Sequence, residues 1–260
     1  MFFDLISDLH VESWPEPFDW THKATSPWCV VAGDVARSRD NLVQVLTHLG
    51  QCYQAVFYID GNDEHYGRYD NFAASYSEIK KLVSEIPGVV YLQDNVVIIN
   101  DIAVMGTNGW WGFDLDVTQD KISVMDWWCD TFALAEHIPL AINEMNRGDA
   151  VYINRSLARL QDETVRHVVM VTHTVPDARL IQHDPLLVGT PMFNVMGNRH
   201  MTAALGSDLA NKVHTWCFGH YHGTIDQIHN GIRYVNNCRG RLNTPWRQMV
   251  YNPLRIEIRD

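Results

Sequence analysis

The chain has 260 residues, which is enough for one large domain or two small ones with a well-buried core. Acidic residues outnumber basic ones by 31 to 20, so the formal net charge is −11 and phosphate backbones are poor partners for this chain. Non-specific nucleic-acid binding is therefore not expected, and the apolar and charged fractions of 46% and 20% argue against disorder.

The cysteines and the N-terminal segment indicate a reduced, untargeted protein. Five scattered cysteines form no Cys-X-X-Cys pair, which argues against a disulfide framework or a zinc ribbon. No basic n-region opens the chain, and no run approaches the ~18 apolar residues of a membrane span. We therefore expect a cytoplasmic protein with no membrane partner.

In the first part of the chain, short apolar runs alternate with helical periodicity. Buried strands are predicted over residues 2–6, 28–32 and 55–59. Helices are predicted over residues 40–49, with Gly50 as the stop, and over residues 71–86, closed by Pro87-Gly88. Further strands are predicted over residues 89–92, 96–99 and 102–106.

Residues 107 to about 165 interrupt this alternation, and the strand pattern returns after them. Two or three helices are predicted there, around residues 119–129, 131–146 and 149–163. Strands follow over residues 168–171 and 213–218, separated by a loop over about 183–200. A closing β-meander is predicted over residues 224–228, 232–236 and 249–258, with Asn230-Gly231 as a hairpin turn.

The alternation of strands and helices predicts an α/β sheet, and polar side chains follow its strands. Ligands of such sheets bind outside the carboxyl ends of the strands. The candidate ligands at these ends are Asp8, His10, Asp34, Asn62, His173, His220 and His222. Carboxylate, imidazole and amide without thiolate suit manganese, iron, zinc or nickel. Seven ligands are too many for one tetrahedral ion, so two ions about 3.5–4 Å apart are expected.

These residues lie in five ordered motifs that closely resemble those of the calcineurin-like metallophosphoesterases. The matching stretches are Asp8-Leu9-His10, Gly33-Asp34, Gly61-Asn62-Asp63-Glu64, His173 and Gly219-His220-Tyr221-His222. The resemblance extends from residue 4 to about residue 241 and is nearest to small bacterial and phage-type predicted phosphohydrolases. It implies an α/β fold, a four-layer α/β/β/α sandwich of two mixed sheets flanked by helices, with the metals at one edge.

The resemblance also implies a role for each ligand. Asp8, His10 and His222 would hold one ion, Asn62, His173 and His220 the other, and Asp34 would bridge the two. The implied activity is that of a phosphoric ester hydrolase, in which a metal-bridging hydroxide attacks phosphorus. The expected substrates are small phosphomonoesters or phosphodiesters, with nucleotides as the best candidates. Manganese is the first expectation for both ions, with iron, zinc or nickel as alternatives.

The sequence departs from the family pattern at Asp63. Family members usually carry a histidine there, which is thought to protonate the leaving oxygen. An ordinary aspartic acid, with a pKa of about 3.9, is ionised at neutral pH and is a poor general acid. His65 could compensate, although the family register puts an aromatic residue at that position. Weak leaving-group protonation would favour activated aryl phosphates over alkyl ones.

Two groups of residues are open to two interpretations each. The tryptophans of the insert could stack a nucleobase or an aromatic leaving group, but core packing is the favoured interpretation. Three arginines could contact a substrate phosphate, but solvated loop charge is favoured for each of them. These residues are Trp110, Trp111, Trp127 and Trp128, and Arg199, Arg239 and Arg241.

We expect residues 1–260 to form a single metallophosphoesterase domain, with residues 107–165 as a helical cap beside the site. Its partner would be a small phosphoester, without a stable nucleic-acid complex. One alternative is a nuclease with the same metal centre, which the acidic charge balance disfavours. Another is a non-catalytic metal-binding scaffold, which only Asp63 favours. The oligomeric state stays open.

Overall fold

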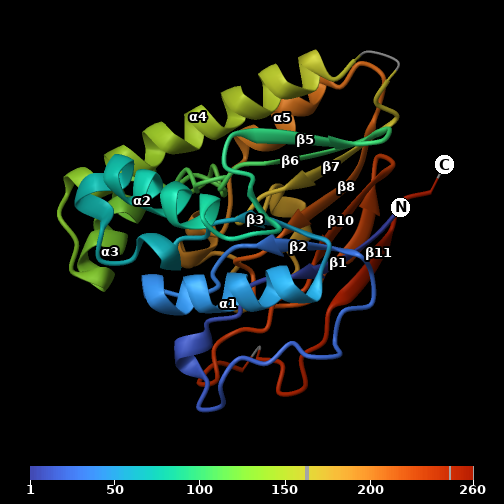
Figure 1. Cartoon of the computed structure of the whole chain (residues 1–260). Coiled ribbons are helices and arrows are strands. Elements are labelled where there is room, and N and C mark those ends of the chain that lie inside the picture. The colour runs from blue at the N-terminus through green and yellow to red at the C-terminus, as the bar shows by residue number, and fades with distance from the viewer. Residues whose placement is uncertain (162–163, 246, 260) are drawn as a thin grey trace.

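In the computed structural model, which describes residues 1–161, 164–245 and 247–259, two β-sheets pack face to face (Figure 1). The first sheet has the strand order β11-β1-β2-β3-β4. Its strands β1 to β4 run parallel to one another, and β11 pairs antiparallel with β1. Their bounds are β1 Phe2–Ile6, β2 Trp28–Ala32, β3 Ala55–Ile59, β4 Val89–Tyr91 and β11 Leu254–Glu257.

The second sheet has the strand order β5-β6-β7-β8-β10-β9. Strands β6, β7, β8 and β10 are parallel, while β5 and β9 are antiparallel strands at the two edges. Their bounds are β5 Asn95–Ile99, β6 Ile102–Gly106, β7 His167–Val171, β8 Val213–Phe218, β9 Asp226–His229 and β10 Ile232–Asn236. Both sheets are therefore mixed, as predicted.

The apolar side chains alternate between the two faces of each strand. In β2, Val30 and Ala32 belong to the core between the sheets, while Cys29 and Val31 face the helices. Strands β3, β6 and β7 divide their side chains in the same way. A strand covered on both faces reads as a continuous apolar run, which explains why these strands could be predicted from the sequence.

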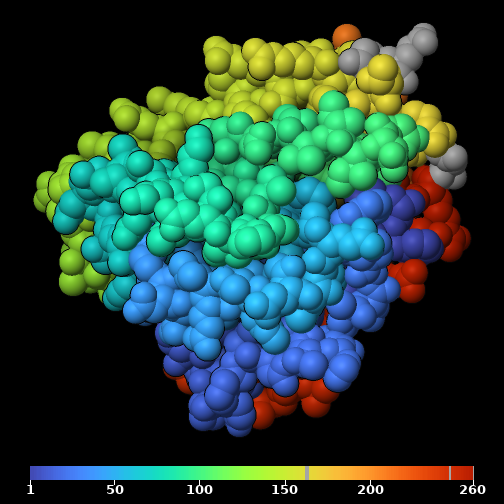
Figure 2. All heavy atoms as spheres, viewed as in Figure 1, coloured from blue at the N-terminus to red at the C-terminus, as the bar shows by residue number. Residues whose placement is uncertain are grey.

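Helices cover the outer face of each sheet. Helices α1 (Arg39–Cys52) and α2 (Phe72–Ser84) pack on the first sheet, and their side chains close over it in the space-filling view (Figure 2). Helices α3 (Lys121–Phe132) and α4 (His137–Arg159) contribute to the core on the second sheet, with the short α5 (His200–Ala203) beside α4. The predicted α/β/β/α sandwich is confirmed. Among the described residues, no helix combines the length and hydropathy needed to cross a membrane.

The predicted stop of the first helix at Gly50 is wrong. Helix α1 continues through Gly50 to Cys52, although glycine in a helix costs about 1 kcal/mol relative to alanine. The reason is close packing, because a Cβ atom on Gly50 would lie 2.6 Å from the carbonyl oxygen of Pro87.

The helices predicted at 131–146 and 149–163 form one continuous helix, α4, which passes through Gly148. Buried residues on both sides of this glycine, Ile142 and Ile153, belong to the same core. Residues 162 and 163 of the predicted segment lie outside the described residues.

The predicted closing meander is wrong as well. Strands β9 and β10 form a hairpin, but β10 continues the second sheet by pairing parallel with β8. Strand β11 belongs to the other sheet, where Leu254 and Ile256 pair with Leu5 and Phe3 of β1. This pairing joins residues about 250 positions apart, so local periodicity does not indicate it.

A buried carboxyl group connects α4 to the end of the second sheet. Asp149 Oδ2 accepts the backbone N–H of Trp110 at 2.8 Å, and Oδ1 lies 2.6 Å from Oγ1 of Thr107. The same hydroxyl oxygen lies 3.0 Å from Asp94 Oδ1. A hydroxyl has one proton and can donate to only one of these carboxyl groups, so the other must bring its own proton. Burial raises the pKa of Asp149 to about 8, and the charge of Asp94 acts in the same direction.

We predict that Asp149→Asn removes part of the pH dependence of stability. Because the pKa of Asp149 is raised from 3.8 to about 8, the folded state binds this proton more tightly than the unfolded state. Its contribution is full at acidic pH and is lost as the pH rises towards 8. The melting temperature of the variant relative to wild type should therefore rise between about pH 5 and pH 8. Parallel melting curves would contradict this prediction, and the exposed Asp126→Asn serves as the control.

Candidate metal centre

All seven predicted ligands lie just beyond the carboxyl ends of parallel strands. Asp8 and His10 follow β1, Asp34 follows β2, Asn62 follows β3, His173 follows β7, and His220 and His222 follow β8. Three of these strands belong to the first sheet and two to the second. The site is therefore built by both sheets at one edge of the sandwich.

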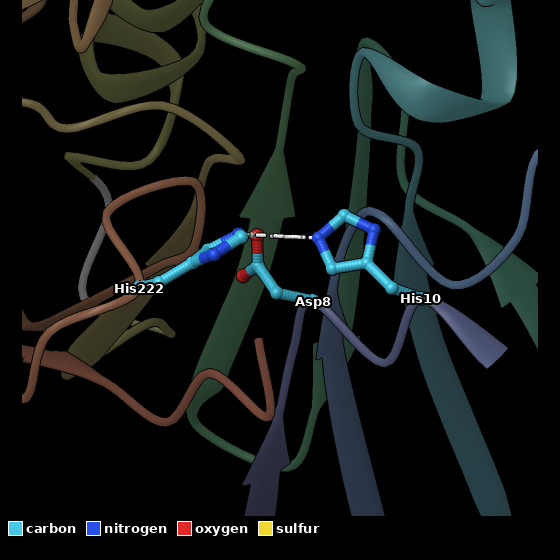
Figure 3. A group of neighbouring side chains, drawn as sticks. All are labelled: Asp8, His10 and His222. Carbon is cyan, nitrogen blue, oxygen red and sulfur yellow. Dashed lines mark hydrogen bonds and ion pairs between the residues drawn. The ribbon is translucent and has the colours of Figure 1, made fainter. Parts of the chain in front are cut away.

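The first group of donor atoms comes from Asp8, His10 and His222, which point toward one another (Figure 3). Nε2 of His10 lies 3.1 Å from Nε2 of His222, which lies 3.3 Å from Oδ1 of Asp8. Burial raises the pKa of Asp8, but the hydrogen bond and charge of His222 more than offset it. The pKa of this carboxyl group is therefore well below its usual range.

The second group comes from Asp34, Asn62, His173 and His220. Nε2 of His173 lies 3.1 Å from Oδ1 of Asn62 and 3.4 Å from Oδ1 of Asp34. Asp34, His173 and His220 also offer three donor atoms within 4.8 Å of one another. The other oxygen of Asp34, Oδ2, lies 3.7 Å from Nε2 of His10. Asp34 thus lies between the two groups.

The hydrogen bonds of the imidazole rings show that this donor set suits a cation. Nδ1 of His173 donates to the carbonyl oxygen of Ala32 at 2.9 Å, which leaves the Nε2 lone pair facing two oxygen atoms. Facing lone pairs repel unless a positive charge lies among them. Burial would lower the pKa of His173, but Asp34 raises it to about 10, so a proton can supply that charge. A divalent ion suits this donor set better than a proton does, because one ion can bind several of these atoms.

Several of the predicted metal ligands have left-handed backbone conformations, which residues other than glycine rarely adopt. The φ angles are 50° at Asp8, 42° at His10, 52° at Asp34 and 64° at His220. Such strained positions persist only where the surroundings fix them, and they cluster at functional sites. The neighbouring Gly33 also has a positive φ, and a Cβ atom there would lie 2.5 Å from Nδ1 of His173.

Glu64 holds two of the ligand loops together. Its Oε2 accepts the backbone N–H groups of Asp34 at 3.1 Å and Gly61 at 2.7 Å. Its Oε1 accepts those of Val35 at 2.7 Å and Ala36 at 3.2 Å. Burial raises the pKa of Glu64 to about 8, while the hydrogen bond from Gly61 opposes the shift. Glu64 lies within the third sequence motif, but the motif does not indicate that its side chain holds these loops together.

Asp63 is part of the site, and its carboxylate is bonded on three sides. Oδ2 accepts Nδ1–H of His10 at 3.0 Å and also contacts Arg241 Nη2. Arg37 donates from Nε and Nη2 at 3.2 and 3.4 Å. Burial raises the pKa of Asp63, but the hydrogen bond from His10 and the two guanidinium charges bring it well below its usual range. Asp63 therefore accepts hydrogen bonds and has no proton to give.

His65 lies in the protein interior. Its Nε2 is 2.7 Å from Oδ2 of Asp60, and its Nδ1 is 2.9 Å from Oγ of Ser75. The side chain is fully buried, with aromatic rings such as Tyr76 and Trp110 packed around it. The ring nitrogens are occupied by these partners, which gives His65 a packing role.

Burial and contacts bear on three of the tryptophans and on one of the arginines. Trp110, Trp111 and Trp128 are 0%, 3% and 4% exposed, as the packing interpretation predicts. Arg241 contacts Asp63 at the site, contrary to the loop-charge interpretation. The sequence motifs do not include Arg37, which donates to Asp63. Its position three residues after Asp34 is the local sequence feature that connects it with the site.

Comparisons with known proteins concern the fold. No protein-family model matches the chain. A solved structure of phosphopantetheinyl hydrolase (PptH) from Mycobacterium tuberculosis is similar, with a TM-score of 0.67 and 19% identity over 95% of each chain. The chain therefore shares the fold of that hydrolase.

Two other proteins are also similar to the chain. The calcineurin-like phosphoesterase YfkN from Bacillus subtilis has a TM-score of 0.48 at 10% identity, over 92% of this chain and 81% of that one. A protein of Acanthamoeba polyphaga mimivirus, named uncharacterized protein L509, is 22% identical over 90% of this chain and 89% of its own length. At these identities the similarity concerns the fold.

We predict that Glu64→Gln weakens metal binding. The amide nitrogen cannot accept hydrogen bonds, so two of the four backbone N–H groups lose their partner and the loops of Asp34 and Gly61 separate. Loss of a group that orients metal ligands costs about 10- to 100-fold in affinity. Titration calorimetry with Mn²⁺ measures the change. The exposed Glu85→Gln, at the end of α2, is the matched control. Equal Mn²⁺ affinity of Glu64→Gln and wild type would show that Glu64 is dispensable.

Proposed function

We propose that the chain is a metal-dependent phosphoric ester hydrolase that binds two divalent ions. The observation that carries the proposal is the pair of buried donor groups that meet at Asp34 beside a cavity of about 420 Å³. The fold shared with phosphopantetheinyl hydrolase supports it, since that protein is named as a hydrolase.

Each ion would take its ligands from one donor group. We assign Asp8, His10 and His222 to one ion, Asn62, His173 and His220 to the other, and Asp34 to both. Asp34 suits the shared position because each of its oxygens faces a different group. Nε2 of His220 donates to the carbonyl oxygen of Val195 at 3.0 Å, so this ring would bind through Nδ1. When bound, the ions would activate water and neutralise charge on phosphoryl oxygens.

The chain's own residues would orient the ligands and the substrate. Asp63 fixes the ring of His10 through Nδ1, so that Nε2 faces the metal site. Arg37 and Arg241 are held at the cavity by the same carboxylate and can donate N–H groups to phosphoryl oxygens. The position that holds the family's histidine is occupied here by a carboxylate that accepts hydrogen bonds.

The proposed substrate is a small phosphoester, with nucleotides as candidates and manganese as the first candidate metal. A cavity of about 420 Å³ is of the size that encloses a small molecule. The net charge of −11 disfavours long nucleic acids, so a stable nucleic-acid complex is not part of the proposal.

Purified protein with Mn²⁺ should hydrolyse bis-p-nitrophenyl phosphate, and a chelator should abolish the release of p-nitrophenolate. His173→Ala should lower kcat by at least about tenfold, because Asp34 and Asn62 lose the imidazole that faces them. The exposed His137→Ala is the control. No turnover with any divalent ion would favour the non-catalytic scaffold.

The rate should depend steeply on the acidity of the leaving group. Because Asp63 carries no proton, the leaving oxygen must depart with little protonation, and activated aryl esters should react far faster than alkyl ones. The measurement is kcat/KM across a series of substituted phenyl phosphodiesters and one alkyl ester. Asp63→His should flatten this dependence. An alkyl ester that wild type cleaves as fast as the nitrophenyl ester would contradict the account.

A further inference from the structure

Two cavities meet over the proposed metal site. The first, of about 420 Å³, contains His10, Asp34 and His222, and we call it the metal cavity. The second, of about 370 Å³, lies against Asn62 and His220 from the other side. The residues that line both cavities are Asn62, Met192, Met196, His220 and Arg241. A phosphorus atom at this junction would have one substituent in each cavity.

The second cavity, which we call the aromatic cavity, has aromatic rings along part of its wall. Five aromatic side chains line it: Tyr66, Tyr69, Trp111, Trp128 and Phe132. Trp111 stacks on His220 with ring centroids 5.5 Å apart and an interplanar angle of 15°. Trp128 contacts Trp111 at 5.8 Å and Phe132 at 5.7 Å between ring centroids. The apolar wall is therefore continuous with a predicted metal ligand.

The rings at the mouth of the aromatic cavity are open to solvent. Tyr66 is 49% exposed and Phe132, the last residue of α3, is 46% exposed. Large exposed rings around a concave surface are typical of a ligand site, because they expose apolar area that a ligand would cover. The inner rings, Trp111 and Trp128, are buried and hold the wall in place.

Charge is concentrated at the junction between the cavities. Arg37 and Arg241 both line the aromatic cavity, and Arg241 also lines the metal cavity. Asp63 accepts hydrogen bonds from Nε and Nη2 of Arg37 and from Nη2 of Arg241. Each guanidinium group has five N–H donors in all. Both groups therefore keep donors for an anion. Arg37 also lies 3.9 Å over the ring of Tyr66, which ties the cationic junction to the aromatic wall.

We infer that the site selects phosphodiesters with one flat aromatic substituent, which binds in the aromatic cavity while the other substituent lies in the metal cavity. The inference rests on the proposed function and specifies its substrate class. A phosphomonoester would fill only one of the two cavities. An aromatic ring gains stacking contacts with Tyr66 and Phe132 that an alkyl group of equal length does not.

Binding and turnover test the inference separately. The first measurement is the affinity of Mn²⁺-loaded protein for phenylphosphonate and methylphosphonate, whose C–P bonds are not hydrolysed at this site, by titration calorimetry. Phenylphosphonate should bind about tenfold more tightly, and Phe132→Ala and Tyr66→Ala should each remove most of this difference. Methylphosphonate affinity should stay unchanged in Phe132→Ala, whose ring contacts Trp128, whereas Tyr66→Ala also removes the ring under Arg37. The half-exposed Phe2→Ala, on β1, is the matched control.

The second measurement compares kcat/KM for bis-p-nitrophenyl phosphate and p-nitrophenyl phosphate. The diester should be preferred because only the diester also fills the metal cavity, and Phe132→Ala should raise KM for both esters because both place a ring in the aromatic cavity. Equal affinity for the two phosphonates, or a preference for the monoester, would overturn the inference while leaving the hydrolase proposal in place. Ring-dependent phosphonate binding without turnover of any ester would overturn the hydrolase proposal and support the aromatic cavity as a binding site. Binding of neither phosphonate would overturn the inference, and the hydrolase proposal would fail with it only if no ester is turned over.

Discussion

The carboxylate of Glu64 is the interaction on which the metal centre depends. It accepts four backbone N–H groups from the turns that follow β2 and β3, and these groups are buried where water cannot replace it. The left-handed backbone conformation at Asp34 is unfavourable and persists because surrounding contacts fix it. By fixing both turns, Glu64 positions Asp34, the proposed shared ligand, together with the neighbouring Asn62.

Much of the fold could be predicted because the central strands are covered on both faces. Strands β2, β3 and β7 show continuous apolar runs, and each run ends at polar residues that proved to be neighbours in space. The errors have a common cause in contacts between distant segments. Gly50 allows close contact with Pro87, and β11 pairs with β1 at the other end of the chain. Neither contact leaves a periodic signal near the residues involved.

The candidate site likewise has one part that the sequence could predict and another part that it could not. Its seven predicted ligands could be listed because each lies at a strand end within an ordered motif, and the structure brings all seven together. The residues around them could not be assigned. Arg37 and Arg241 meet at Asp63 from 26 and 178 residues away, and an arginine in a loop has no local feature that reveals its partner. His65, which the sequence offered as an acid, is enclosed by Asp60 and Ser75.

The contacts of Asp63 explain why replacing a catalytic histidine need not erode the site. A histidine at this position could offer a proton but would repel Arg37 and Arg241 when charged, whereas a carboxylate holds both at the junction of the two cavities. The same oxygen that binds Arg241 also accepts Nδ1–H of His10. In the proposed function, the substitution would therefore exchange proton donation for anion recognition and ligand orientation. Such a site gains most from substrates whose leaving group is already stable as an anion, and an aromatic substituent meets that requirement while filling the cavity beside His220.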